Sequence, residues 1–205
     1  MSNEVKTKEK VDMDPKYIIK LTVTLFATCV VVAGLLGLVN MVTEGPIADI
    51  NKANTEAAMK AVVSDPDNTS FSEALEITGD MTAAASSAGA SVTEAYEVQV
   101  GGAPAGYALK IVSSGSQGNI EMMVGVDGEG AVTGVSIVDN SETSGIGSRV
   151  MSNENGVLDQ FIGKSAADGT LAVGTNVDAI SGATVSSRGV TTGVNAALAV
   201  AGVMG

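Results

Sequence analysis

Two short segments hold most of the side chains whose types and spacing could do chemistry. They are residues 140–147 (NSETSGIG) and residues 178–188 (DAISGATVSSR). Each combines hydroxyl side chains with glycine, which lets a backbone turn sharply. We expect the second segment to lead into a helix over about residues 186–204, with Ser186 or Ser187 as its N-cap.

The start of this helix predicts an anion site beside Thr184. The first N–H groups of a helix have no partner within it, and the positive end of the helix dipole lies there. Arg188 follows Thr184 by four residues and could donate a charge-assisted hydrogen bond to the same ligand. The arrangement favours a phosphate group. The alternative is an ordinary helix cap. Chance alone produces Ser-Gly-Ala-Thr about 0.02 times in such a chain, so the four residues are suggestive but do not by themselves identify a cofactor.

The composition of the 205-residue chain excludes several kinds of chemistry. It contains no histidine, which excludes a Ser-His-Asp triad, a His-ligated zinc and a His-ligated haem. Its single cysteine, Cys29, excludes a disulfide framework, a CxxC pair and an iron–sulfur cluster held within this chain. Any redox chemistry must therefore come from an organic cofactor.

The charge of the chain argues against nucleic acid as a partner. Eleven basic residues face 23 acidic ones, for a formal charge of -12, so the term that dominates nucleic-acid binding would be repulsive. No basic cluster occurs beyond the first twenty residues. Aromatic residues make up only 3%, which also disfavours a stacking platform for bases or sugars.

Residues 21–43 form an uncharged apolar run that predicts one transmembrane helix. At 1.5 Å per residue it measures about 34 Å, enough to cross a hydrocarbon core of roughly 30 Å. The alternative is a cleaved signal peptide, but the run exceeds the usual core of about 7 to 15 residues and no small-x-small site follows. Cys29 lies inside the run, where we interpret it as a small buried hydrophobe.

The flanking charges predict the orientation of this helix. Basic residues concentrate before it, at Lys6, Lys8, Lys10, Lys16 and Lys20, whereas only Lys52 and Lys60 occur in the twenty residues after it. By the positive-inside rule the short N-terminus is cytoplasmic and the remainder extracytoplasmic. Six basic and nineteen acidic residues after Thr43 give that remainder a net charge of -13.

The soluble part predicts an α+β fold. We expect a helix from Pro46 to about Val63, and a surface connection over the small-residue segment 82–91. Period-two patterns over residues 92–100, 106–112, 119–126 and 131–138 predict an antiparallel meander. A short helix over 157–162, an extended piece over 171–177 and the final helix follow. Strands grouped apart from helices are typical of an α+β layer.

These elements predict four regions along the chain. They are a cytoplasmic N-terminus (1–20), the transmembrane helix (21–43), a helical and low-complexity connecting region (44–91), and a cofactor-binding domain of antiparallel sheet flanked by helices (92–205).

The segment DAISGATVSSRGV resembles the flavinylation motif, Asp-x-x-Ser/Thr-Gly-Ala-Thr, of the FMN-binding domain family. Within that family the chain is most similar to the G subunits of Rnf electron transport complexes. The C subunits of sodium-pumping NADH:quinone oxidoreductases are close relatives. The resemblance runs from about Tyr17 through the block 106–150 to the final helix.

The resemblance implies that Thr184 carries FMN through a phosphoester, installed by a separate flavin transferase from FAD with magnesium. It implies further cofactor-binding residues in both segments. Those of the motif are Asp178, Ser181, Gly182 and Ala183, followed by Ser186, Ser187 and Arg188 at the helix start. Those matching the family loop Glu-Thr-Pro-Gly-Leu-Gly near the isoalloxazine ring are Glu142, Thr143, Gly145, Ile146 and Gly147. The chain departs from this loop at Ser144, where the family has proline, and at Ile146, where it has leucine.

The function that this resemblance implies is electron transfer through FMN, as a one- or two-electron relay. The chain would be a redox subunit of a membrane-bound ion-translocating ferredoxin:NAD oxidoreductase, with no complete activity of its own. Its partners would be the other subunits, the flavin transferase and membrane lipid. Alternatives are a C subunit of the quinone reductase, an anchored extracellular flavin shuttle, or, from a different class, a cofactor-free anchored structural or sensor module.

Overall fold

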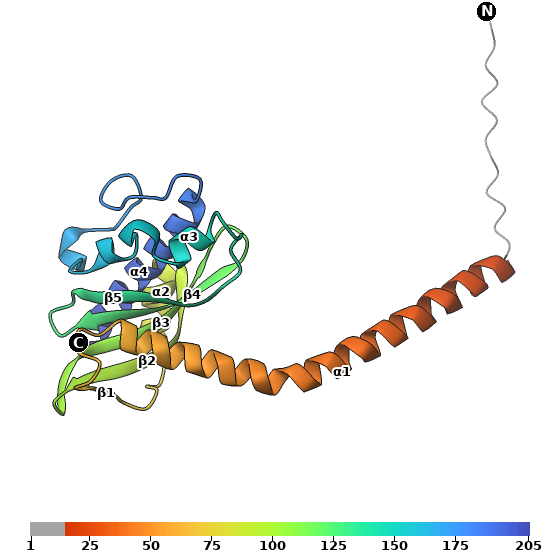
Figure 1. Ribbon diagram of the computed structural model, residues 1–205, viewed down its shortest axis with the longest axis horizontal. Helices are drawn as coiled ribbons and strands as arrows, with labels where there is room; N and C mark the ends of the chain where they lie inside the picture. Colours follow the sequence, from red (N-terminus) through yellow and green to blue (C-terminus); the bar gives the residue numbers. More distant parts are fainter. Residues whose placement is uncertain (1–14) are drawn as a thin grey trace, which may run out of the picture. The chain divides into compact units, whose positions relative to one another are not determined.

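The computed structural model describes residues 15–205 of a chain that divides into two compact units, Met1–Asp49 and Ile50–Gly205. Helix α1 (Pro15–Ala61) contributes residues to both units (Figure 1). Most of the predicted cytoplasmic segment, including Lys6, Lys8 and Lys10, lies outside the described residues.

Helix α1 contains the predicted membrane span. Among the described residues it is the one helix long and apolar enough to cross a membrane, and its most apolar part is not buried against the protein. The prediction of a separate helix starting at Pro46 is wrong, because Pro46 lies inside α1. Proline removes one backbone donor, but its fixed φ is that of a helix, and here the helix continues to Ala61.

Five antiparallel strands form one sheet, in the order β1-β2-β3-β4-β5. They are β1 (Thr69–Phe71), β2 (Ala90–Val100), β3 (Ala103–Ser114), β4 (Asn119–Asp127) and β5 (Val132–Asn140). The predicted four-strand meander is confirmed. Strand β1 was not predicted, because three residues are too few to show a period of two. It pairs with the end of β2, where Ser70 lies opposite Gln99.

The segment predicted to be a surface connection over residues 82–91 is instead helix α2 (Gly79–Ser87) and the start of β2. The backbone N–H of Met81 donates to the side chain of Thr78, which caps the helix. Alanine has the highest helix propensity of all residues, and Ala85 is fully buried. The small residues of this segment thus form a helix that packs closely against the rest of the domain, and not a surface connection.

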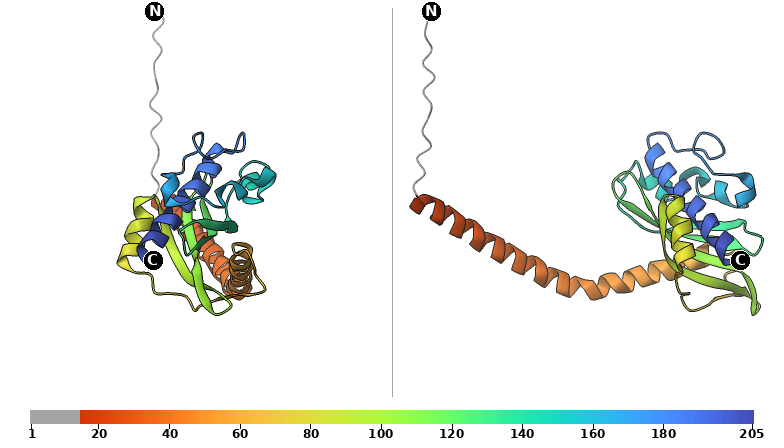
Figure 2. Two further views of the ribbon diagram at one scale, coloured as in Figure 1. Left: turned by 90° about the vertical axis from the view of Figure 1, so that its left-hand side faces the viewer. Right: turned by 180° about the vertical axis from the view of Figure 1, so that it is seen from behind.

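Helices α2 and α4 (Thr184–Met204) cover one face of the sheet (Figures 1 and 2). They enclose the main core, in which Met122 of β4 packs with Val194 and Ala197 of α4. Met123, the next residue of β4, is also fully buried but belongs to a smaller cluster. Successive side chains of a strand point to opposite faces, so the sheet is buried on both.

The second face of the sheet packs against residues at and after the C-terminal end of α1. Ala58, Met59 and Val62 form a cluster with Met123 of β4. The Thr133 hydroxyl donates a 2.6 Å hydrogen bond to the Val62 carbonyl. These contacts lie within the second compact unit, so the last turns of α1 are part of its core.

The segment between β5 and α4 consists of short elements. They are α3 (Ser148–Met151), η1 (Glu154–Gly156), η2 (Asp159–Phe161) and η3 (Ala166–Asp168). The helix predicted over 157–162 is reduced to the single turn of η2. The extended piece predicted over 171–177 is wrong, since the Gly174 N–H donates to the Val177 carbonyl across a tight turn. Gly174, at φ +87°, allows that turn.

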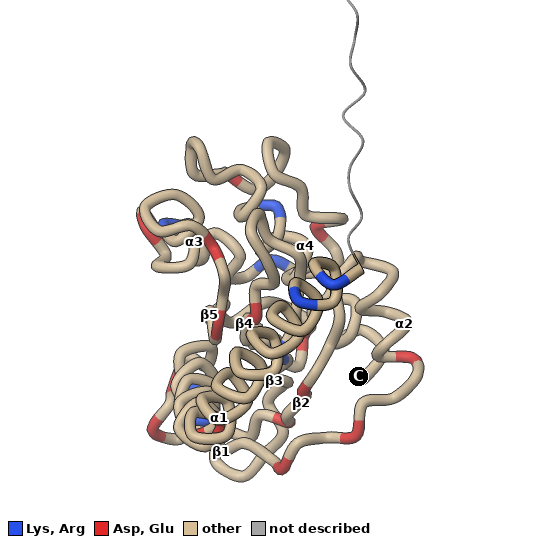
Figure 3. The backbone as a smooth tube through the Cα atoms, turned by 90° about the vertical axis from the view of Figure 1, so that its right-hand side faces the viewer, with Lys and Arg blue, Asp and Glu red and all other residues tan. Residues whose placement is uncertain are grey.

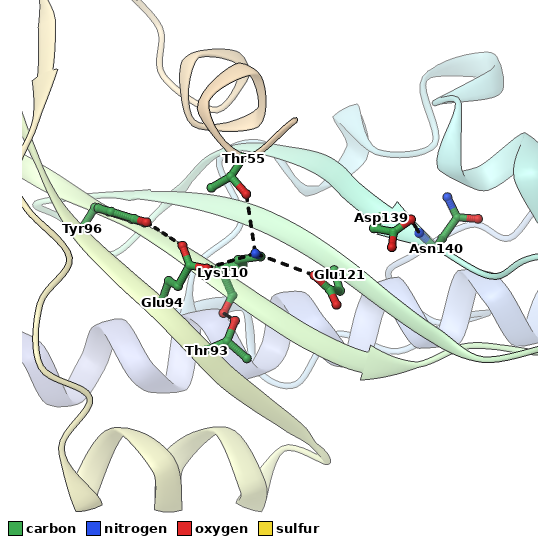
Figure 4. A network of polar contacts seen from close by, with 8 residues as sticks. All are labelled: Thr55, Thr93, Glu94, Tyr96, Lys110, Glu121, Asp139 and Asn140. Carbon is green, nitrogen blue, oxygen red and sulfur yellow. Dashed lines mark hydrogen bonds and ion pairs between the residues drawn. The ribbon is translucent and has the colours of Figure 1, made fainter. Parts of the chain in front are cut away.

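Acidic residues are spread over the turns and strands of the second unit rather than gathered in one place (Figure 3). Among its few cations, Lys110 of β3 is largely buried, with 12% of its side chain exposed. Its Nζ lies 3.0 Å from Glu94 Oε1, 3.7 Å from Glu121 Oε2 and 3.5 Å from Thr55 Oγ1 of α1 (Figure 4). This ammonium group therefore joins the end of α1 to the sheet.

A second donor, Tyr96, completes this cluster with a 2.5 Å hydrogen bond to Glu94 Oε2. Partial burial raises the pKa of Glu94, but the hydrogen bonds from Tyr96 and Lys110 and the charge of Lys110 outweigh it, so the pKa of Glu94 lies below its ordinary value. Burial, together with the hydrogen bond to Glu94 and its charge, raises the pKa of Tyr96 to about 12.

We expect Tyr96→Phe to remove one ionisation near pH 12 from the ultraviolet phenolate titration of the folded protein. A tyrosine whose pKa is higher in the folded than in the unfolded state stabilises the fold at pH values below its unfolded-state pKa of about 10. This stabilisation is lost as the pH rises through the pKa of the folded state. The wild-type protein should therefore lose stability between about pH 10 and pH 12, and Tyr96→Phe should lose less. Loss of an ionisation near pH 10, the ordinary value for tyrosine, would contradict the cluster.

Candidate cofactor site

The two chemically promising segments come together at one cavity of about 150 Å³. The first segment contributes its loop between β5 and α3, and the second contributes the start of α4. A third segment, the turn between β3 and β4, joins them through Ser116. The lining residues are Ser116, Glu142, Thr143, Ile146, Gly147, Gly182, Ala183, Thr184, Val185 and Ser186.

Helix α4 begins two residues earlier than the sequence predicts. Its N-cap position is Ala183, which makes no side-chain cap bond, and Thr184 is the first helical residue. Ser186 and Ser187 are not N-caps because both lie inside the first turns, buried to 1% and 2% exposure. The unpaired amides that a helix start offers are therefore those of Thr184, Val185 and Ser186, which line the cavity.

Ser187 holds the loop in front of the helix. Its hydroxyl donates a 3.1 Å bond to the Ala183 carbonyl and accepts a 3.4 Å bond from the Ile180 N–H. The Ala183 N–H in turn donates to the Ile180 carbonyl at 2.9 Å. Gly182 has φ +84°, a conformation that side-chain-bearing residues rarely adopt. The chain thus makes a tight, internally bonded turn directly before Thr184.

Glu142 connects all three segments that line the cavity. Its Oε2 accepts a 2.5 Å hydrogen bond from the Ser186 hydroxyl on α4. Its Oε1 accepts hydrogen bonds from the N–H groups of Ser116 at 2.6 Å and Gln117 at 3.3 Å. Both carboxylate oxygens are therefore occupied by protein donors. Ser116 lies outside both segments predicted from the sequence, although the Gly-Ser-Gln-Gly turn between two strands signals a sharp reversal there.

The loop after Glu142 is closed by its own hydrogen bonds. The N–H groups of Ile146 and Ser148 both donate to the Thr143 carbonyl at 3.2 Å, and the Gly145 N–H donates to the Ser148 hydroxyl at 2.8 Å. The loop is thus a bonded turn that includes Ser144.

Thr184 presents a free hydroxyl at the centre of this arrangement. Thr184 is half-buried and lines the cavity, and its hydroxyl forms no hydrogen bond with any other residue of the described part of the chain. Ile146 and Val185, which also line the cavity, are apolar yet 53% and 52% exposed. The cavity therefore combines polar donors with two uncovered apolar side chains.

Two of the expected motif residues lie beside a different hollow, of about 420 Å³. Asp178 and Ser181 line it together with the ion pair between Arg149 and Glu154, whose Nη2 and Oε1 are 2.6 Å apart. The hydrogen bond from Arg149 lowers the pKa of Glu154.

The side-chain amide of Gln160 fixes the backbone of Asp178. It accepts from the Asp178 N–H at 2.7 Å and donates to the Asp178 carbonyl at 3.0 Å. Arg188 is exposed and is not among the residues that line the cavity beside Thr184.

The donors of the first cavity suit a phosphate group. Helix-start amides and the hydroxyls of Ser116 and Thr143 are neutral donors, and the one charged lining residue, Glu142, has both oxygens hydrogen-bonded. A volume of about 150 Å³ is below the roughly 300–1,000 Å³ of pockets that enclose a drug-sized ligand. The cavity thus has the size and donors for a phosphate group and is too small to enclose a drug-sized ligand.

Part of the chain matches a known domain family. Residues 115–199 match the family model of the FMN-binding domain, and these residues include all three segments that line the cavity. A crystal structure of NqrC from Shewanella oneidensis aligns with 65% of this chain and 64% of that chain, at a TM-score of 0.42 and 20% identity.

Two curated relatives match over almost their whole length. The G subunit of the Na⁺-translocating ferredoxin:NAD⁺ oxidoreductase complex of Acetobacterium woodii is 36% identical over 96% of this chain and 97% of its own. The G subunit of the ion-translocating oxidoreductase complex of Methanosarcina acetivorans is 30% identical over 90% and 95%, respectively. With its candidate membrane helix and its FMN-binding domain, the chain belongs to the family of G subunits of the ion-translocating oxidoreductase complexes known as Rnf complexes.

Proposed function

We propose that this chain is the electron-transfer subunit of a membrane-bound, ion-translocating ferredoxin:NAD oxidoreductase and carries FMN covalently on Thr184. One observation carries the proposal: the hydroxyl of Thr184 is free and lies at the first helical position of α4, beside unpaired amides that suit a phosphate. The similarity to the Acetobacterium woodii subunit along 97% of its length supports the role in the complex.

The attachment is a phosphoryl transfer onto Thr184. The threonine Oγ1 bonds to the phosphorus of the FMN half of FAD, and the bond from that phosphorus to the bridging oxygen breaks. AMP leaves with the electron pair, and the hydroxyl proton passes to a base of the flavin transferase or to water. The product is a phosphodiester with one negative charge, which the helix start offsets.

The charge of the domain favours a covalent link over reversible binding. With six basic and nineteen acidic residues after Thr43, the domain repels free FMN, which is anionic. A reversible site outside the cytoplasm would empty, because little FMN is available there to rebind. A phosphoester on Thr184 prevents this loss.

The residues around Thr184 hold and orient the group. The amides of Thr184, Val185 and Ser186 bind phosphate oxygens, and the exposed side chains of Ile146 and Val185 offer an apolar surface to the isoalloxazine ring. Bound FMN supplies the redox chemistry, accepting and releasing one or two electrons. Because the cavity is smaller than FMN, the ring stays accessible to the redox subunits that exchange electrons with it.

Ion translocation is a property of the whole complex. Residues 21–43 carry no charged side chain, whereas ionisable residues within membrane segments are what marks ion pathways. We therefore assign the chain electron transfer only, with other complex subunits, a flavin transferase and membrane lipid as partners. The regions are a cytoplasmic segment (1–20), a membrane helix (21–43) and an extracytoplasmic flavin domain. The region from Ile50 to residue 91, predicted as a connection, is part of that domain, because Ile50–Gly205 is one compact unit.

We expect Thr184→Ala, produced with a flavin transferase, to contain no covalent flavin, because its side chain has no oxygen to form the phosphoester. Thr184→Ser keeps a hydroxyl and should be flavinylated. The measurement is flavin fluorescence on a denaturing gel, with peptide mass spectrometry to locate an FMN-sized addition.

Thr192→Ala, two turns further along α4, is the matched control and should retain the wild-type flavin content. Circular dichroism of Thr184→Ala should show an intact fold. A wild-type chain that stays colourless beside a transferase active on another substrate would contradict the proposal and favour a cofactor-free anchored module.

The proposed orientation predicts which positions a membrane-impermeant thiol reagent reaches in intact cells. In a Cys29→Ser background, Glu129→Cys in the exposed β4–β5 turn should be labelled before lysis. Ser2→Cys should be labelled only after lysis, because the positive-inside rule places the N-terminus in the cytoplasm. The opposite pattern would invert the topology and place the flavin domain in the cytoplasm.

A further inference from the structure

The turn between β3 and β4 forms one wall of the cavity through Ser116. This turn is not part of the flavinylation motif. We propose that the Ser116 hydroxyl binds the phosphate or ribityl part of FMN attached to Thr184, and that Glu142 is a positioning residue that holds Ser116 against the start of α4. This inference rests on the proposed attachment of FMN.

Ser116 has the geometry of a ligand-binding residue. Its side chain is exposed and lines the same cavity as Thr184, and its hydroxyl forms no hydrogen bond with any residue between 15 and 205. Its backbone N–H is fixed by the 2.6 Å hydrogen bond to Glu142. The turn is thus held in place while the hydroxyl is left available to a ligand in the cavity.

Glu142 acts through other residues rather than on the phosphate. One of its oxygens bonds to the Ser186 hydroxyl and the other to the N–H groups of Ser116 and Gln117. A carboxylate turned toward a phosphodiester would be repelled. The hydrogen bonds instead use its charge to join two segments that are far apart in the sequence.

Two glycines leave the space that this carboxylate occupies. A Cβ on Gly115 would overlap Glu142 Oε1, and a Cβ on Gly147 would overlap Glu142 Oε2 and lie 2.9 Å from Ser186 Oγ. Neither glycine has the positive φ that would by itself require glycine. The Glu142 carboxylate therefore accounts for the absence of a side chain at both positions. At Gly115, Ile120 contributes as well, because a Cβ there would lie 2.9 Å from Ile120 Cδ1.

The Glu142 side chain offers a conservative replacement that tests positioning. In Glu142→Gln, the amide oxygen still accepts from Ser116 and Gln117, and the amide nitrogen can donate to Ser186 Oγ, which accepts as readily as it donates. Glu142→Ala removes every one of these contacts. A positioning role therefore predicts that glutamine restores what alanine loses.

The experiment uses the full chain produced with a flavin transferase and measures two properties of each variant. The first is the rate of covalent FMN incorporation, and the second is the ³¹P chemical shift of the attached phosphodiester, which reports its hydrogen bonds. The variants are Ser116→Ala, Glu142→Ala, Glu142→Gln and Gly115→Ala. The matched controls are Asn119→Ala at the start of β4, Glu129→Ala, and Gly128→Ala in the β4–β5 turn.

We expect Ser116→Ala and Glu142→Ala to shift the ³¹P resonance and to slow incorporation about tenfold, as expected for loss of a hydrogen bond to a charged group. Gly115→Ala should reproduce Glu142→Ala by displacing the same carboxylate. Glu142→Gln and the three controls should match wild type. Thermal unfolding followed by circular dichroism identifies any variant that fails to fold.

The possible failures are distinguishable. If wild type acquires no covalent FMN, the proposed function fails. If wild type is flavinylated but folded Ser116→Ala keeps the wild-type resonance and rate, the role of Ser116 is overturned. If folded Glu142→Gln is as impaired as Glu142→Ala, the negative charge itself is needed and the positioning role is overturned.

Discussion

A helix offers unpaired backbone donors only in its first turn, so the site depends on where α4 begins. That start is fixed from both directions. Downstream, α4 is buried against the sheet over most of its length. Upstream, the turn through Gly182 is bonded to the buried hydroxyl of Ser187. Thr184 takes the first helical position as a result, with its amide and hydroxyl at the same edge of the cavity.

Two buried hydroxyl groups hold the start of α4 against the loops beside it. Ser186 and Ser187 are adjacent on the first turns of α4, and both are almost fully buried. Because neighbouring helical residues point in different directions, the Ser186 hydroxyl bonds to Glu142 in the loop after β5, while the Ser187 hydroxyl bonds to the loop before the helix. Two consecutive small polar residues thus connect the helix start to its two neighbouring loops without occupying the cavity.

The sequence allowed the meander, the final helix and the membrane helix to be predicted because each repeats a pattern over many residues. It failed where a few tertiary contacts decide the structure. Ser186 and Ser187 have the composition of N-caps, yet burial moves the helix start to Thr184. Ala85 sits in a low-complexity segment that packing turns into α2. Ser116 carries no motif, and only the fold brings it to a cavity formed by residues far along the chain.

The last turns of α1 limit how short a fragment of this domain can be. Met59 and Val62 are buried against one face of the sheet, and α2 covers part of the other. A soluble fragment cut at the start of the meander would expose both faces to water and lack the partner of β2 at the sheet edge. A fragment starting near Ile50 keeps these contacts, so the shortest self-sufficient fragment of the FMN-binding domain includes the last turns of α1.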